Sequence, residues 1–438
     1  RAERIDEQQP PDEWRPDAED ELDRLGGLQR AEDPRQHAED ATGGAVGDGS
    51  RCGGCRVHAA VAGALGGGVD AEASLEAMHA RLDEGLPLED MEFYQFHPTG
   101  LYPLGILLTE GARGEGGILR NALGERFMER YAPTIKDLAP RDLVSRAMYL
   151  EVREGRGCGP KKDHVLLDLT HLPPEIIEKK LPDITDFARV YQGVEPISEP
   201  VPVQPTAHYA MGGVPTNLET EVLANAAGAV VPGLFAAGEV ACVSVHGANR
   251  LGSNSLVDLL VFGKRAGKRM AAICKSTTAP KHVAGAERAI REEMLALSTR
   301  PEGVRPAEIR RALADVMMES VGVYRDEALL TSAVKEIQRL KGEYQHVRVE
   351  DTGSVFNTDL LEARELGYLL DVSEATAVSA LARKESRGAH SREDYPERDD
   401  AKFLAHTMVW RGTDQAPATK IDYKPVTITK FEPKPRVY

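Results

Sequence analysis

The chain has 438 residues, of which 41% are hydrophobic and 28% are charged, a composition typical of a globular protein with several domains. The formal net charge of −16 and the lack of a basic patch argue against a nucleic-acid partner. No run of about 20 apolar residues occurs, so we expect no membrane span. The acidic, polar start lacks an apolar core, and we expect no signal peptide.

Residues 1–84 differ in composition from the rest of the chain. They contain Trp14 but neither Phe nor Tyr, and apolar residues recur with a regular period only from about Ala71 to Leu82. Such a segment buries little apolar surface, so we predict that it is disordered or loosely helical, or translated from another reading frame. The five cysteines form an odd, scattered set that favours a reducing compartment. One isolated CxxC, Cys52–Cys55, is too little to indicate metal, and we expect no metal site.

The next part of the chain carries signals for both strands and helices. Val165–Leu169 is apolar enough for a strand, and Gly228–Ala237 predicts two short buried strands around Pro232-Gly233. We predict a helix over Asn254–Met270, with Ser253 or Asn254 as its N-cap.

Three amphipathic segments follow, over residues 309–320, 329–340 and 360–381. Their similar lengths and short connections predict an antiparallel helical bundle. From about Ala401 the polar and apolar residues alternate, with Pro425, Pro433 and Pro435 as breaks, which predicts strands and an extended tail.

A polar constellation occupies residues 97–117, HPTGLYPLGILLTEGARGEGG. It combines His97, Thr109, Glu110 and Arg113 with glycines that allow close backbone approach. A site that binds a small anion and moves a proton needs such residues. The alternative is a glycine-rich surface turn.

Two shorter motifs follow. Arg141-Asp142 comes after Pro140, where a helix can begin, and in the alternative interpretation Arg141 is a solvated surface residue. His208 precedes a glycine pair in HYAMGG, which indicates either close approach to a ligand or a β-turn.

The most informative stretch is GLFAAGEVACVSVHGANRLGSNSLVD, residues 233–258. We predict a buried strand ending at Gly238-Glu239, a loop with His246, Asn249 and Arg250, and then a helix N-terminus. Such a terminus carries unpaired N–H donors and binds anions, including the anionic edge of a reduced flavin. An ordinary strand-to-helix turn is the alternative.

Three further motifs are GERFMERYAP, REGRGCG and RGAHSREDYPERDD. Taken in order with those above, they resemble the flavoprotein subunit of succinate dehydrogenase and fumarate reductase. The resemblance covers about residues 85–438. It implies an α/β fold with α+β parts: a capping domain (85–205), an incomplete FAD-binding Rossmann-like domain (206–280), a helical bundle (281–400) and a C-terminal domain (401–438) that ends in an extended tail.

The resemblance also implies a role for each site residue. His97 and Thr109 would hold one substrate carboxylate, and His208 and Arg250 the other. Arg141 would transfer the proton, with Glu110 and Arg113 as its relay. Glu239 would bind the ribityl or ribose part of FAD, and Ser255 and Leu256 would offer backbone donors to the flavin.

The implied activity is oxidation of succinate to fumarate by hydride transfer to FAD. An iron–sulfur subunit and membrane-anchor subunits would pass the electrons to quinone, which places the chain peripherally on the cytoplasmic face of the membrane. Fumarate reductase, L-aspartate oxidase and a non-catalytic fragment are the alternatives. Gly111-Ala112 after Glu110 and the late SREDYPERDD favour the dehydrogenase over the aspartate oxidase.

One family feature is missing from this sequence. Family members begin with a strand, a GxGxxG turn and a helix that bind the ADP part of FAD, followed by a His that carries the flavin. Gly66–Gly68 does not match that pattern, and His37, His58 and His79 lie in other contexts. We therefore expect a truncated or misread chain with weak or no FAD binding.

Overall fold

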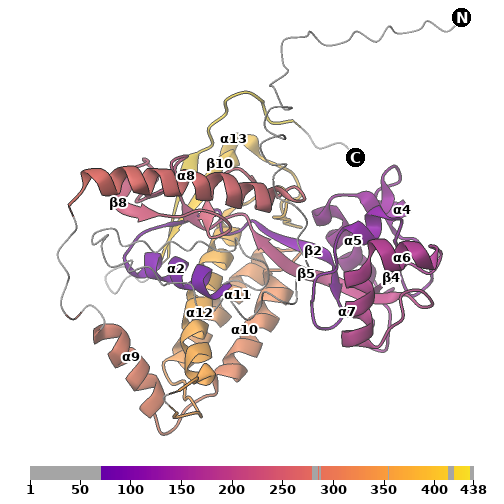
Figure 1. The fold of residues 1–438 in the computed structure, drawn as a ribbon, viewed down its shortest axis with the longest axis horizontal. Coiled ribbons are helices and arrows are strands. Elements are labelled where there is room, and N and C mark those ends of the chain that lie inside the picture. The colour runs from indigo at the N-terminus through magenta and orange to yellow at the C-terminus, as the bar shows by residue number, and fades with distance from the viewer. Residues whose placement is uncertain (1–70, 279–284, 286–287, 354, 413–418, 435–438) are drawn as a thin grey trace, which may run out of the picture. The chain divides into compact units, whose positions relative to one another are not determined.

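The structure, a computed structural model, describes residues 71–278, 285, 288–353, 355–412 and 419–434. All of them belong to one compact unit, Gly53–Tyr438. Expectations that concern residues 1–70, including the Cys52–Cys55 pair, His37 and His58, lie outside the described residues. The fold is mixed α/β with several small open sheets (Figure 1). Within the described residues, no helix is both long and apolar enough to cross a membrane.

The largest sheet is antiparallel, with strand order β2-β5-β4-β3. Its strands are β2 (Tyr94–Leu101), β3 (Ile118–Arg120), β4 (Val165–Asp168) and β5 (Val201–Ala210). The prediction of a strand from Val165 is confirmed. Figure 1 shows helices grouped around β4. These helices and the sheet share one hydrophobic core, whose buried residues lie between Leu101 and Val203 in the sequence. These helical elements are α3 (Gly111–Gly114), α4 (Met128–Tyr131), η1 (Lys136–Leu138), α5 (Arg141–Arg153), α6 (Pro174–Lys180) and α7 (Pro182–Gln192).

Three smaller sheets complete the strands of the described chain. They are the antiparallel β1 (Leu88–Glu89), β10 (Ala405–Trp410) and β11 (Lys420–Pro425), the parallel pair β6 (Val214–Pro215) and β9 (Ala241–Cys242), and the antiparallel pair β7 (Glu221–Leu223) and β8 (Val230–Phe235). Strands β10 and β11 confirm the strands predicted after Ala401. The short helix α13 (Asp400–Phe403) before them was not predicted.

The prediction of two buried strands over Gly228–Ala237 is wrong. A single strand, β8, runs through Pro232-Gly233, and Val230 is 40% exposed. Within the described residues β8 pairs only with β7, so it is an edge strand, where a proline costs no ladder hydrogen bond. The strand that precedes the loop of His246 is β9, which begins after Gly238-Glu239 instead of ending there.

The predicted helix after this loop is confirmed as α8 (Asn254–Ser276), with Ser253 as its N-cap, and it continues past Met270. The Ser253 side chain makes no capping hydrogen bond. Along α8, Leu256 and Leu260 are 63% and 71% exposed. An apolar face of this helix is therefore open in the described part of the chain.

The three predicted helices of the bundle are confirmed as α10 (Pro306–Ser320), α11 (Glu327–Tyr344) and α12 (Thr358–Ala382). They pack side by side over a shared core (Figure 1). The side chains of Asp326 and Asn357 accept a hydrogen bond from the first turn of α11 and of α12, which explains where both helices begin. A fourth helix, α9 (Arg288–Thr299), packs against α12 and was not predicted.

The last part of the segment 1–84 is folded. Residues Ala71–Asp83 form helix α2, which packs against α12, and Met78 and Leu82 are buried. The expectation of disorder is therefore wrong for this stretch. The physical reason is that two apolar side chains one helical turn apart find a partner helix nearly three hundred residues later.

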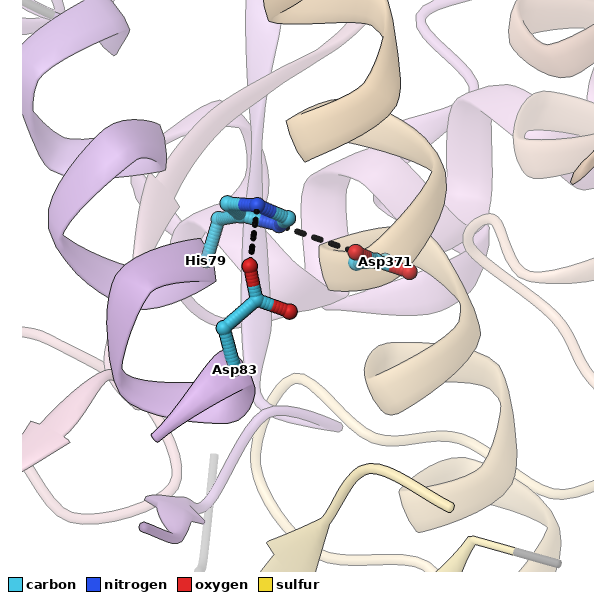
Figure 2. Close-up of side chains that lie close together, drawn as sticks. All are labelled: His79, Asp83 and Asp371. Carbon is cyan, nitrogen blue, oxygen red and sulfur yellow. Dashed lines mark hydrogen bonds and ion pairs between the residues drawn. The ribbon is translucent and has the colours of Figure 1, made fainter. Parts of the chain in front are cut away.

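An ion-pair network fixes α2 to α12. Figure 2 shows the His79 ring between the carboxylates of Asp83 and Asp371, at 2.9 and 2.8 Å. Burial disfavours the protonated ring, but the two carboxylates outweigh it and raise the pKa of His79 to about 9. Lys341 lies 2.6 Å from Asp371 and joins α11 to the same network.

Candidate active site

Strand β2 carries the first site residue, His97. The ring is only 3% exposed, and its Nδ1 lies 3.3 Å from the backbone N–H of Thr99. Nδ1 therefore accepts, and we assign the proton to Nε2. Burial, with Arg141 and other nearby cations, lowers the pKa of His97 to about 2. His97 is a neutral hydrogen-bond donor.

Glu110 joins two arginines. Arg141 Nε donates to Glu110 Oε2 at 2.8 Å, and a terminal nitrogen of Arg113 donates to Glu110 Oε1 at 3.1 Å. The Glu110 side chain is 40% exposed, whereas that of Arg113 is buried. Burial and the charge of Arg141 lower the pKa of Arg113. The structure thus brings the three predicted relay residues together, and Glu110, the middle member of this chain of bonds, reaches solvent.

Local structure explains where Arg141 and Arg113 lie. Helix α5 begins at Arg141 directly after Pro140, and Asp142 occupies its first turn, as the motif predicts. The Arg113 guanidinium donates to the backbone carbonyls of Asp137 and Ala139, just before that helix. The Arg141 side chain is 13% exposed, so its interpretation as a solvated surface residue is wrong.

The opposite side of the site holds His208 and Arg250. A terminal nitrogen of Arg250 donates to His208 Nε2 at 2.9 Å, which leaves the proton on Nδ1. Burial, with the charges of Arg141 and Arg250, lowers the pKa of His208 to about 4. The Arg250 guanidinium lies 4.3 Å from the ring centre of Tyr209. The rings of His97 and His208 are 5.2 Å apart, so both sets face one site.

A cavity of about 450 Å³ lies between these groups. Of the residues predicted for catalysis or substrate binding, those that line it are His97, Thr109, Glu110, Arg141 and His208. Arg113 and Arg250 do not line it, but each contacts a residue that does. The wall also includes residues that were not predicted for it: Leu107, Leu108, Gly111, Asp183, Ile184, Phe187, Gly252 and Ser253.

Two of the three residues assigned to the flavin, Ser255 and Leu256, lie in the helix start next to this cavity. Glu239 is exposed and lies between β8 and β9. Ser255 and Leu256 lie in the first turn of α8, and the Ser255 hydroxyl accepts a hydrogen bond of 3.4 Å from Arg250. The cavity wall continues through Gly252 and Ser253 into this helix start.

The glycine pair after His208 has a structural role that was not predicted. A Cβ at Gly212 would lie 2.3 Å from the backbone oxygen of Asp90, and one at Gly213 would lie 2.4 Å from that of Val240. These glycines admit the chain's own backbone. Close approach of a ligand at this pair stays a prediction.

Gln95 is a site residue that sequence reasoning missed. It is fully buried, donates to Asn249 Oδ1 at 2.8 Å and to the Arg250 carbonyl at 2.7 Å, and accepts from Arg141 at 3.2 Å. Gln95 stands two residues before His97 on one strand, which puts both on the same face. That spacing was the available signal.

Two clusters of metal-ligating residue types occur among the described residues. They are His79, Asp83 and Asp371, and Glu89, Asp90 and Cys242. Side-chain cations already pair with both: Lys341 and Arg411 with the first, and His406 and Lys424 with the second. We therefore interpret both clusters as ion-pair networks.

Comparison with known proteins gives two family matches. Residues 72–256 match the FAD binding domain family, and residues 310–438 match the fumarate reductase flavoprotein C-terminal family. The succinate dehydrogenase flavoprotein subunit of Rickettsia bellii is 49% identical over 371 residues, which cover 81% of this chain and 61% of the relative.

Solved structures give the same result. An E. coli quinol fumarate reductase chain is 42% identical with a TM-score of 0.77, over 84% of this chain and 64% of that one. A chain of the Mycobacterium smegmatis Sdh1 complex is 37% identical with a TM-score of 0.68, over 82% and 59%. The described chain thus spans about 60% of the length of these proteins. Over the matched residues, the chain belongs to the family of succinate dehydrogenase and fumarate reductase flavoprotein subunits.

Proposed function

We propose that this chain binds a C4 dicarboxylate and oxidises succinate to fumarate as a succinate dehydrogenase flavoprotein, with residues 85–205 as a capping domain over an FAD-binding part. The observation that carries the proposal is the cavity of about 450 Å³ with Arg141 in its wall and Arg250 directly behind His208. A dianion of two carboxylates there would meet the Arg141 guanidinium directly and the positive charge of Arg250 across His208.

The two histidines would orient the ligand through hydrogen bonds and would not add positive charge. Both are held neutral by their low pKa values, so His97 and His208 act as hydrogen-bond donors that orient the carboxylates. His97 and Thr109 would hold one carboxylate, and His208 and Arg250 the other. A substrate held at both ends is fixed in one conformation, which lowers the entropic part of the barrier.

Proton transfer would run along Arg141, Glu110 and Arg113. Oxidation of succinate removes a hydride from one carbon and a proton from its neighbour. Arg141 lines the cavity and would take that proton, and Glu110 would pass it on, because its carboxylate bonds both arginines and reaches solvent. The lowered pKa of the buried Arg113 lessens the usual preference of arginine for the cationic state along this path.

The residues present fit the flavin end of FAD. In the described chain, Arg250 Nε and Asp258 Oδ1 are buried without a hydrogen-bond partner, and no side chain caps the start of α8. Those are polar groups that a flavin edge would satisfy. Glu239 would contact the ribityl or ribose part, and Ser255 and Leu256 would offer backbone donors. When bound, FAD supplies the hydride acceptor.

The same residues serve fumarate reduction, in which Arg141 would donate the proton. Direction depends on the flavin potential and on the partners. By analogy with the quinol-dependent complexes to which the chain is similar, the partners would be an iron–sulfur subunit and membrane-anchor subunits. The chain would then attach peripherally to the cytoplasmic face of a membrane.

Two measurements on the full chain supplied with FAD test the proposal. Calorimetry should detect malonate binding, and succinate should reduce an artificial dye. Substituting Arg141→Lys keeps the positive charge but displaces the proton-transfer group, so turnover should fall by about 10²–10⁴-fold while malonate still binds. Arg189→Lys, at an exposed ion pair with Glu195, is the matched control and should leave both values unchanged. A wild-type chain that binds no malonate would refute the proposal.

A further inference from the structure

The late motif RGAHSREDYPERDD lies beside the site but takes no part in the chemistry above. Its first residues, 387–393, and the preceding Ser386 adjoin a cleft of about 850 Å³ whose wall also includes Arg146 of α5 and Tyr324. The cleft separates this segment from α5 along part of its length. The contacts that cross it show what the segment holds.

One set of contacts joins the segment to the loop that carries Arg250. The Ala389 N–H donates to the Ala248 carbonyl at 2.8 Å. Gly388 has φ +56°, and a Cβ there would lie 2.4 Å from the same carbonyl oxygen. This backbone approach is therefore possible only with glycine. Ala248 is two residues from Arg250, so the segment fixes the base of that loop.

A second set joins the segment to helix α5, which begins with Arg141. Arg146 donates to the Gly388 carbonyl at 3.2 Å in the middle of the helix. At the end of the helix both terminal nitrogens of Arg153 donate to the Glu393 carboxylate, each at 2.9 Å. The Arg153 guanidinium also lies 5.3 Å from the ring centre of Tyr324.

The segment itself is firmly anchored to the rest of the fold. The Arg325 N–H donates to the Ser391 carbonyl at 3.0 Å, and the Glu393 N–H donates to the Arg325 carbonyl at 2.8 Å. Arg325 is completely buried, and its guanidinium bonds the ring of His390 at 2.7 Å. A rigid support therefore carries both sets of contacts.

Helix α5 packs on the sheet that holds His97. The Ser145 hydroxyl donates to the Phe96 carbonyl at 3.1 Å, and Val144 and Met148 are buried in the core of that sheet. The position of Arg141 is therefore set by where this helix and sheet rest. Arg250 belongs to the loop on the other side of the site.

From these contacts we infer that residues 386–393 form a positioning bracket that sets the spacing between Arg141 and Arg250, and so the length of dicarboxylate that the site accepts. The inference rests on the proposed dicarboxylate site. Arg146, Arg153, Gly388 and Glu393 are positioning residues because they act through the two arginines. A bracket of this kind affects discrimination between ligands more than affinity for any single ligand.

The test compares malonate, succinate and glutarate, which differ only by methylene groups. Calorimetry on the full chain with FAD gives the affinity for each. The variants are Gly388→Ala, which forces the segment off the loop, and Glu393→Lys, which opposes Arg153. We expect each variant to reduce the preference for succinate over glutarate by roughly fivefold or more. The swapped pair Arg153→Glu with Glu393→Lys should restore it.

The controls separate this inference from the proposed function. Swapping Arg189 and Glu195, an exposed pair with the same two-bond geometry, should leave the preference unchanged. Glu393→Gln tests the same contact if Glu393→Lys fails to fold. If the variants lower the affinity for all three ligands by the same factor, the bracket inference is wrong.

A wild-type chain that binds none of the three ligands would refute the dicarboxylate site instead. Hydrogen exchange in the first turn of α5 would then decide the bracket alone. Faster exchange in Glu393→Lys, reversed by the swap, supports it, and unchanged exchange overturns it.

Discussion

Gln95 offers the sharpest test of how the site is held together. Its amide connects Arg141 to Asn249 and to the Arg250 carbonyl, and Asn249 in turn donates to Asp142 at 3.0 Å. Gln95→Leu fills nearly the same volume but removes all three hydrogen bonds that the Gln95 side chain makes. The substitution therefore isolates their contribution.

The magnitude follows from what is left unpaired. The variant strands two acceptors, the Asn249 side-chain oxygen and the Arg250 carbonyl, and a buried acceptor without a partner costs about 1–3 kcal/mol. We expect the free energy of unfolding to fall by about 3 kcal/mol, because Asn249 is only partly buried. Arg141 keeps its bond to Glu110 but loses its second contact, so we expect turnover to fall by roughly 10–100-fold.

Urea denaturation and succinate-dependent dye reduction measure the two effects separately. Gln192→Leu is the matched control, because Gln192 also donates to two backbone carbonyls, those of Tyr102 and Pro202, but lies away from the cavity. It should lose similar stability and keep its turnover. If Gln95→Leu loses stability without losing turnover, Gln95 has only a structural role and the reasoning about Arg141 is wrong.

The remaining predictions concern pH, packing and the ligand. The raised pKa of His79, about 9, means that the protonated ring stabilises the fold by about 3 kcal/mol below pH 6.5, and this stabilisation disappears as the pH rises through 9. Thermal unfolding of His79→Gln at alkaline pH should show no such decrease in stability. Gly212→Ala places a Cβ against the Asp90 backbone and should lower the melting temperature, whereas Gly263→Ala, in open space on α8, should raise the free energy of unfolding by about 0.5–1 kcal/mol. Arg250→Lys loses the geometry for paired bonds and should weaken malonate binding about tenfold or more by calorimetry.

Much of the polar site was predictable because its residues lie in short, dense motifs. His97, Glu110 and Arg141 each stand beside glycine, proline or an opposite charge, and His208 is followed four residues later by a glycine pair, which an ordinary surface or core segment does not require. The helices of the bundle were predictable for a different reason: apolar periodicity over more than ten residues is a strong local signal.

What could not be predicted depends on distant partners. Ile184 and Phe187 enter the cavity wall from α7, which carries no motif, and only packing of that helix places them there. The motif around Gly212 does not reveal that the Asp90 backbone lies against this glycine. His79 lies in a segment of low aromatic content, and its partner Asp371 is nearly three hundred residues away. Such contacts leave no trace in local sequence.

The neutrality of both histidines explains why the site needs two arginines on separate supports. Adjacent cations lower the pKa of His97 to about 2 and of His208 to about 4, so neither ring can supply charge for a dicarboxylate at physiological pH. The positive charge must come from Arg141 and Arg250, which repel each other if they stand close together. Arg141 stands on α5 and Arg250 in the loop before α8, and in the proposed function a ligand with two carboxylates would bridge them. In the proposed site, residue type would set the charge of the ligand, and the way in which the two supports are joined would set its length.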